Sequence, residues 1–203
     1  MKRLLVIVNP QNDFVTPEGS MYTPGSEGAL KNIYRYIRKT GDRLDDILVL
    51  SKSYQRLYPG FSSFWKETPE IGTRITRDMI LSGTYTPGLP LHDPPEEILI
   101  TPEHCIIGST GHGFPSELVD VLGVWSVLNK RLVLHNEPLQ EDDYSEIVLS
   151  GFRKDNDIVS VINTVREKSK LVFFLSGMAG VRNYNPLPVY QDCIDNYGAR
   201  VLE

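Results

Sequence analysis

The stretch that most constrains the fold is an apolar run near the amino terminus that stops abruptly at polar residues. Residues 4–8 are all leucine, valine or isoleucine, and Asn9 follows them directly. A short, uninterrupted apolar run of this kind is typical of a strand that is buried on both faces, as in a parallel sheet. Polar residues just after such a strand lie at the carboxyl edge of the sheet, where open α/β proteins bind their ligands.

The rest of the chain alternates strand-like runs with helical periodicity. Further strands are predicted at 47–50, 132–134, 171–175 and 199–202, and helices at 27–38, 77–82, 115–129, 158–165 and 189–197. This alternation, with right-handed crossovers, predicts a three-layer α/β/α fold in which helices cover both faces of a mainly parallel, Rossmann-like sheet. Residues 65–103 are rich in proline, and we interpret them as an inserted lid or edge segment within a single domain spanning 1–203.

The composition excludes several classes of protein. A chain of 203 residues that is 40% hydrophobic can bury a core without disulfides or metals. The net charge of −5 disfavours nucleic acid and anionic membranes as partners. No apolar stretch approaches the roughly 20 residues that span a bilayer, and no signal-peptide core follows Met1, so we expect a cytoplasmic protein. Cys105 and Cys193 do not form a CxxC pair, and we interpret both as small buried residues.

Four motifs resemble the nicotinamidase/isochorismatase-like cysteine hydrolases. They are Gln11-Asn12-Asp13-Phe14 after the first strand, His104-Cys105 with the glycines up to Gly111, Asp143-Tyr144-Ser145, and the Gly177-Met178-Ala179 turn, which in the family carries a cis peptide. They occur in the family's order and span most of the chain. The resemblance implies the isochorismatase-like fold and hydrolysis of an amide or related carbonyl by a cysteine, an aspartate and a lysine.

The same resemblance implies that the catalytic residues have been replaced. The family's aspartate, lysine and cysteine fall on Asn9, on Asn136 or His135, and on Asn183, Arg182 or Tyr184. In the family this cysteine directly begins a helix. An asparagine side chain has no proton to exchange near neutral pH and is a very poor nucleophile. Joint replacement by amides also avoids leaving one buried charge without its partner, which costs about 3–5 kcal/mol.

The metal site of the nicotinamidases is also incomplete in this sequence. The resemblance places its first ligands on Ser53 and Gln55 and a further ligand on Phe61 or Ser62, so that only His104 is retained. One imidazole does not make a zinc or iron site, because such sites need three or four ligands. We therefore expect no metal and no other cofactor, and a hydrogen-bonding role for His104 at the rim of the pocket.

We predict a polar pocket made of residues at the matched positions. Its members are Asn9, Gln11, Gln55, His104, Asn136, Tyr144, Ala179 and Asn183. Asp13 is expected to accept backbone hydrogen bonds and fix a turn rather than to act in catalysis. An aromatic group either stacks on a planar ligand or packs beneath the insertion; it comprises Tyr54, Tyr58, Phe61, Phe64 and Trp65.

Three functional hypotheses follow. The favoured one is a catalytically inactive member of the fold with a binding, regulatory or structural role, whose pocket takes a small planar ligand. The alternative is an active hydrolase on a small amide that uses relocated residues, such as His104 with Ser109, Cys105 or Asp143. The third is a structural subunit of a homo-oligomer or of a complex with another protein.

Overall fold

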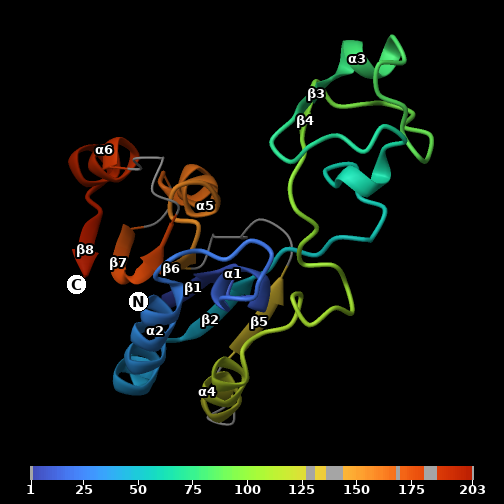
Figure 1. Ribbon diagram of the computed structural model, residues 1–203. Helices are drawn as coiled ribbons and strands as arrows, with labels where there is room; N and C mark the ends of the chain where they lie inside the picture. The colour runs from blue at the N-terminus through green and yellow to red at the C-terminus, as the bar shows by residue number, and fades with distance from the viewer. Residues whose placement is uncertain (1, 127–130, 136–143, 168–169, 181–186, 203) are drawn as a thin grey trace.

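The computed structural model describes residues 2–126, 131–135, 144–167, 170–180 and 187–202, and its centre is a six-stranded sheet (Figure 1). The strands lie in the order β5-β2-β1-β6-β7-β8, and every neighbouring pair is parallel. Their bounds are β1 Arg3–Val8, β2 Asp46–Leu50, β5 Arg131–His135, β6 Glu146–Phe152, β7 Lys170–Ala179 and β8 Arg200–Leu202.

Helices cover both faces of this sheet, as predicted. On one face lie α2 (Ser26–Thr40) and α4 (Ser116–Ser126), and on the other α5 (Asp157–Val165) and α6 (Leu187–Tyr197). Alternation along β1 sends Leu5 and Ile7 to the first face and Leu4 and Val6 to the second. The three-layer α/β/α fold is therefore confirmed. No helix in the described part of the chain is long and apolar enough to span a membrane.

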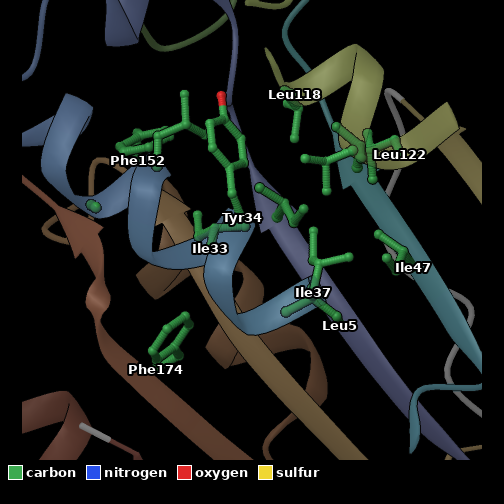
Figure 2. Packing of buried hydrophobic residues seen from close by; sticks show 14 of the residues in the cluster. Leu5, Ile33, Tyr34, Ile37, Ile47, Leu118, Leu122, Phe152 and Phe174 are labelled. Carbon is green, nitrogen blue, oxygen red and sulfur yellow. The ribbon is translucent and has the colours of Figure 1, made fainter. Parts of the chain in front are cut away.

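The packing of α2 illustrates why this sequence forms these layers. Its buried residues recur at helical spacing, and Ile33, Tyr34 and Ile37 face β1 and its neighbours, with Leu5 and Phe174 among the residues they pack with (Figure 2). Each fully buried side chain of this size contributes about 1.5–3 kcal/mol to folding. The rigid sheet that results holds the strand ends, and the loops that follow them, in fixed positions.

One strand of the six-stranded sheet was not predicted, namely β6, which pairs with β1 on the side opposite β2. The run of β6 is broken by Ser150, which is polar but fully buried because its hydroxyl donates to the carbonyl of Val6 at 2.9 Å. The strand predicted at 171–175 is β7, one place further from β1, and it extends to Ala179. Gly177, Met178 and Ala179 therefore belong to a strand rather than a turn, and no peptide bond among the described residues is cis.

The segment between β2 and α4 contains the predicted insertion at 65–103. It forms β3 (Arg74–Thr76) and β4 (Glu97–Leu99), which pair antiparallel, and the short helix α3 (Arg77–Leu81). These elements are set apart from the main sheet (Figure 1). They have a small core of their own, formed by Phe64, Trp65, Ile75, Ile98 and Ile100. Three short helices complete the described structure: α1 (Asn12–Val15), η1 (Gly41–Arg43) and η2 (Ser62–Phe64).

Candidate functional site

A pocket of about 340 Å³ lies at the carboxyl edge of the sheet. The chain builds outward from β1 to β2 and β5 on one side and through β6, β7 and β8 on the other, so the strand order reverses at β1. The crevice at such a reversal is where open α/β sheets bind ligands. The pocket is lined by Phe14 after β1, by Lys52, Tyr54 and Tyr58 after β2, by Arg153, Asn156 and Asp157 after β6, and by Met21, 71–72, 99–102 and His104.

A second pocket, of about 520 Å³, lies between α2 and α4 beside Trp125. It is remote from the ends of the strands β1, β2 and β6, which carry the polar side chains of the first pocket. We therefore take the pocket at the sheet edge as the candidate site.

Asp13 holds one wall of the pocket in place. Its Oδ2 accepts the backbone N–H of Cys105 at 2.6 Å, and its Oδ1 accepts the N–H and the hydroxyl of Ser20 at 3.2 and 3.1 Å. A side chain at Gly111 would clash with the Asp13 carboxylate, so glycine is required there. The prediction that Asp13 fixes a turn is confirmed, and the turn is the one that presents His104.

Gln11 performs a similar task between the loops after β1 and β2. Its Nε2 donates to the carbonyls of Lys52 and His112 at 2.8 and 3.0 Å, and its Oε1 accepts the N–H of Lys52 at 2.6 Å. Gln11 is fully buried and its amide is fully engaged, so it does not face a ligand. The prediction of a pocket-binding role for Gln11 is wrong; it positions Lys52, which does line the pocket.

His104 lies in an aromatic environment at the back of the pocket. Its ring is 6% exposed and makes edge contacts with Phe14, Tyr54 and Phe61 at centroid distances of 5.7, 5.0 and 5.7 Å. Nδ1 lies 2.8 Å from the carbonyl of Pro102, which assigns the proton to Nδ1 and leaves Nε2 without a partner among the described residues. Burial lowers the pKa of His104, and this outweighs the opposing effect of the Pro102 carbonyl.

An ion pair crosses the pocket between the loops after β2 and β6. Lys52 Nζ lies 3.0 Å from Oδ1 of Asp157, whose side chain is 13% exposed. Burial by itself would lower the pKa of Lys52, but its interactions with Asp157, Tyr54 and Tyr58 together outweigh burial, and the pKa is raised. Asp157 is the first residue of α5, where the helix dipole favours a negative charge. Its second oxygen, Oδ2, is buried and has no hydrogen-bond partner among the described residues.

Arg153 reaches the pocket from a tight loop at the end of β6. A side chain at Gly151 would clash with the backbone of Val8, so β6 and β1 end in close contact. Gly151 and Arg153 both have positive φ, 115° and 57°, which turns the chain over the strand ends. Strained non-glycine residues of this kind cluster at functional sites. The Nε of Arg153 is buried without a hydrogen-bond partner in the described structure.

The other predicted pocket residues lie elsewhere. Asn9 is 2% exposed, has φ 50° and carries an unpartnered Nδ2 within the described structure, but it does not line the pocket. Gln55 is exposed and is not part of the lining. The hydroxyl of Tyr144 donates to Asp46 Oδ2 at 2.6 Å, at the start of β2 and hence at the opposite edge of the sheet. Placing Gln55 and Tyr144 in the pocket was wrong.

The remaining candidates add no lining. Ala179 ends β7, and its carbonyl accepts the N–H of Lys154 at 2.9 Å without lining the pocket. Asn136 and Asn183 lie outside the described residues, as do the alternatives Arg182 and Tyr184. His135 is the last residue of β5. Of the predicted pocket residues that the structure describes, His104 alone lines the pocket.

The residues at the family's metal positions do not fit a metal ion. Ser53 Oγ lies 2.8 Å from Nε2 of His112, Gln55 is exposed, and Ser62 donates to the carbonyl of Pro69 at 2.7 Å. Phe61 is fully buried and has no ligating atom. Within the described ranges no three His, Cys, Asp or Glu side chains are grouped so as to hold a metal. His104 is left as a single imidazole.

Neither cysteine belongs to the pocket lining. Cys105 is completely buried in the core on the α2 face, and burial raises the pKa of its thiol. Cys193 is buried in the core on the α6 side, where burial again raises the pKa. The thiolate is the nucleophilic form of cysteine, so both residues are poorly suited to catalysis. This agrees with their prediction as small buried residues.

The aromatic group divides between the pocket lining and the core of the insertion. Tyr54 and Tyr58 line the pocket and stack at a centroid distance of 4.4 Å. Phe64 and Trp65 pack in the core of the insertion. Phe61 lies between the two sets, in edge contact with Tyr54 and His104.

Sequence reasoning missed the charged residues of the site, Lys52, Arg153 and Asp157. It aligned the nucleophile position with the turn after the predicted strand at 171–175 and so placed this position at Asn183. The strand order instead places β6 beside β1, and the residue that begins the following helix is Asp157. The signal that would have found it is the apolar run 147–149 with Phe152 shortly after it, followed by polar residues up to the start of α5.

Comparison with solved structures identifies the architecture. The fold is similar to that of the yeast nicotinamidase bound to the inhibitor nicotinaldehyde, with 16% identity, 99% of each chain covered and a TM-score of 0.72. The nicotinamidase/pyrazinamidase of Bacillus subtilis matches with 15% identity, 100% of each chain and a TM-score of 0.68. The N-carbamoylsarcosine amidase of Thermoplasma acidophilum matches with 14% identity, 99% of this chain, 95% of that chain and a TM-score of 0.56.

No family model matches the chain, and no curated protein matches it in sequence. The likeness therefore lies in the fold. The protein has the isochorismatase-like α/β fold of the nicotinamidases and pyrazinamidases.

Proposed function

We propose that this protein binds a small planar ligand in the pocket at the sheet edge and does not hydrolyse it by thiol chemistry. The observation that carries the proposal is the lining itself. Aromatic rings of Phe14, Tyr54 and Tyr58 lie together with polar side chains of Lys52 and Asp157 around about 340 Å³. Rings provide flat apolar contact for a planar molecule, and a few placed polar groups orient it.

The chemistry of the surrounding residues supports binding over hydrolysis by a cysteine. The residue after β1 is Asn9, which cannot take a proton from a thiol, and it is buried behind the lining. Both cysteines are buried outside the pocket with raised pKa values. The residue that begins the helix after β6 is an aspartate, already paired with Lys52. None of these groups can therefore act as a thiolate nucleophile or as the base that would generate one.

The test combines a binding assay with a turnover assay. Unfolding temperature is measured with benzamide, nicotinamide, benzoate and nicotinate, because a ligand at 100 times its dissociation constant adds about 2.7 kcal/mol to stability. Ammonia release from the two amides is measured in parallel, before and after alkylation with iodoacetamide. We expect at least one compound to raise the unfolding temperature, with no ammonia release.

Variants connect the binding to this pocket. Tyr54→Leu removes a ring from the lining and should weaken binding, whereas Tyr197→Leu removes a ring on α6 that is remote from the pocket. Ammonia release that alkylation abolishes would overturn the proposal. A panel without any stabilising compound would also overturn it and favour the structural-subunit hypothesis.

A second candidate function is hydrolysis that uses a carboxylate in place of the thiol. The observation that favours it is Oδ2 of Asp157, which borders the pocket without a partner in the described structure, while Oδ1 is held by Lys52. A carboxylate in this position can accept a proton from a water molecule that attacks an amide carbonyl. Its mark would be ammonia release that survives alkylation and is lost in Asp157→Asn.

A further inference from the structure

We infer that Arg153 selects ligands that carry an anionic group, so that the pocket prefers a planar carboxylate to the corresponding neutral amide. This inference rests on the proposed binding function and gives its ligand a chemical class. It concerns a residue to which neither the motifs nor the fold comparison assigns a role. Three features of the structure carry it, namely the missing partner of Arg153, the charge balance of the pocket and the rings beside it.

The first feature is that the guanidinium group of Arg153 has no hydrogen-bond or ion-pair partner in the described structure. No carboxylate there lies within ion-pair distance of its guanidinium, and its Nε is a buried donor without an acceptor. A guanidinium group in a protein always carries its positive charge. A buried donor without an acceptor is costly, and a bound anion would remove that cost.

The second feature is the charge balance. The pocket lining contains two cations, Lys52 and Arg153, and one anion, Asp157. Asp157 is engaged with Lys52 at 3.0 Å, so the positive charge of Arg153 remains uncompensated. The site therefore carries a net attraction for an anion.

The third feature decides which anion fits. Inorganic phosphate would satisfy the charge of Arg153 but would make no apolar contact with the lining rings of Tyr54 and Tyr58. An aromatic carboxylate places its ring against these side chains and its two oxygens on the guanidinium, whose forked donors match a carboxylate. We therefore favour a ring carboxylate, and the test distinguishes it from phosphate.

The experiment measures dissociation constants for benzoate, benzamide and inorganic phosphate by calorimetry at low ionic strength. Benzoate and benzamide have the same ring and nearly the same shape, so their ratio reports on charge. We expect benzoate to bind at least about tenfold more tightly than benzamide, the change typical of one hydrogen-bonded charge pair. Phosphate should bind more weakly than benzoate, and added salt should reduce the preference.

Variants assign the preference to Arg153. Arg153→Met should bring the two constants together, and circular dichroism shows whether the variant folds. Arg153→Lys should retain most of the preference. Lys154→Met removes the neighbouring charge, which does not line the pocket, and should leave the ratio unchanged.

The outcomes separate this inference from the proposed function. Equal binding of benzoate and benzamide by the unmodified protein would overturn the selection of anions and leave ligand binding intact. A preference that persists in Arg153→Met would overturn the assignment to Arg153. Tighter binding of phosphate than benzoate would overturn the ring carboxylate as the ligand class. If benzoate, benzamide and phosphate all failed to bind at concentrations up to about 10 mM, the binding function itself would be refuted.

Discussion

Replacing Asp13 with alanine should destabilise the protein strongly, although Asp13 takes no part in chemistry. The substitution removes the acceptor of the Cys105 N–H, which is held at 2.6 Å and belongs to a fully buried residue. A hydrogen bond to a charged group contributes about 1.5–3 kcal/mol. The two bonds to Ser20 are longer, at 3.2 and 3.1 Å, and lie nearer the surface, so they add about 0.5–1 kcal/mol. The expected total loss is about 3 kcal/mol.

The backbone of Cys105 makes this loss harder to avoid. Cys105 has φ 48°, a conformation that a residue with a side chain adopts only when its surroundings impose it. Asp13→Asn should not restore full stability, because its amide nitrogen would face either the Cys105 N–H or the Ser20 N–H, and two donors repel each other. We expect the asparagine variant to lie between alanine and the unmodified protein.

Urea unfolding followed by circular dichroism measures the effect. With a slope of about 2 kcal/mol per M, a loss of 3 kcal/mol lowers the midpoint by about 1.5 M. Glu18→Ala is the matched control, because Glu18 is an exposed carboxylate in the same loop region and should change stability by less than about 0.5 kcal/mol. If Asp13→Ala shifted the midpoint no more than Glu18→Ala, the hydrogen bonds of Asp13 to Cys105 and Ser20 would not be the source of stability that we infer.

Three further predictions concern the ends of the strands and the buried titratable groups. Gly151→Ala should lower the free energy of unfolding in urea by more than about 2 kcal/mol, because Gly151 has φ 115° and an added side chain would clash with Val8. The control Gly28→Ala lies in an open part of α2 and should be neutral or stabilising. Equal unfolding midpoints for the two variants would contradict this prediction. Iodoacetamide should label neither cysteine of the native protein but both in urea, since burial raises both pKa values; rapid native labelling would count against their burial. The pKa of His104 is lowered in the folded protein, so the unfolded chain binds the proton more readily, and stability should fall as the pH drops below about 6.5. His104→Gln should make the free energy of unfolding depend less on pH in this range. An unchanged pH dependence in the variant would show that other groups cause it.

Much of the fold can be predicted from the sequence because local patterns encode it. The apolar run at 4–8 and the helical stripe of α2 each contain their own burial pattern, and both elements form where they are predicted. The local part of the role of Asp13 was also predictable, since a short acidic side chain after a strand often accepts nearby backbone N–H groups, as it does from Ser20. Its bond to Cys105, 92 residues along the chain, was not predictable in this way. β6 escaped because Ser150 and Gly151 interrupt its run, and only its neighbour Val6 supplies the partner for the buried hydroxyl.

The content of the pocket depended on strand order, which no local pattern contains. Because β6 and not β7 pairs with β1, Arg153 and Asp157 line the pocket together with Lys52 at the strand ends. Asn9, the one expected asparagine that the structure describes, is not part of this lining. Gln11 and Tyr144 show the same limit, because each bonds to residues far away in the chain. The sequence by itself therefore determined the layers and the polar ends of the strands. Tertiary structure alone decided which charges meet, because that depends on contacts between segments separated by about a hundred residues.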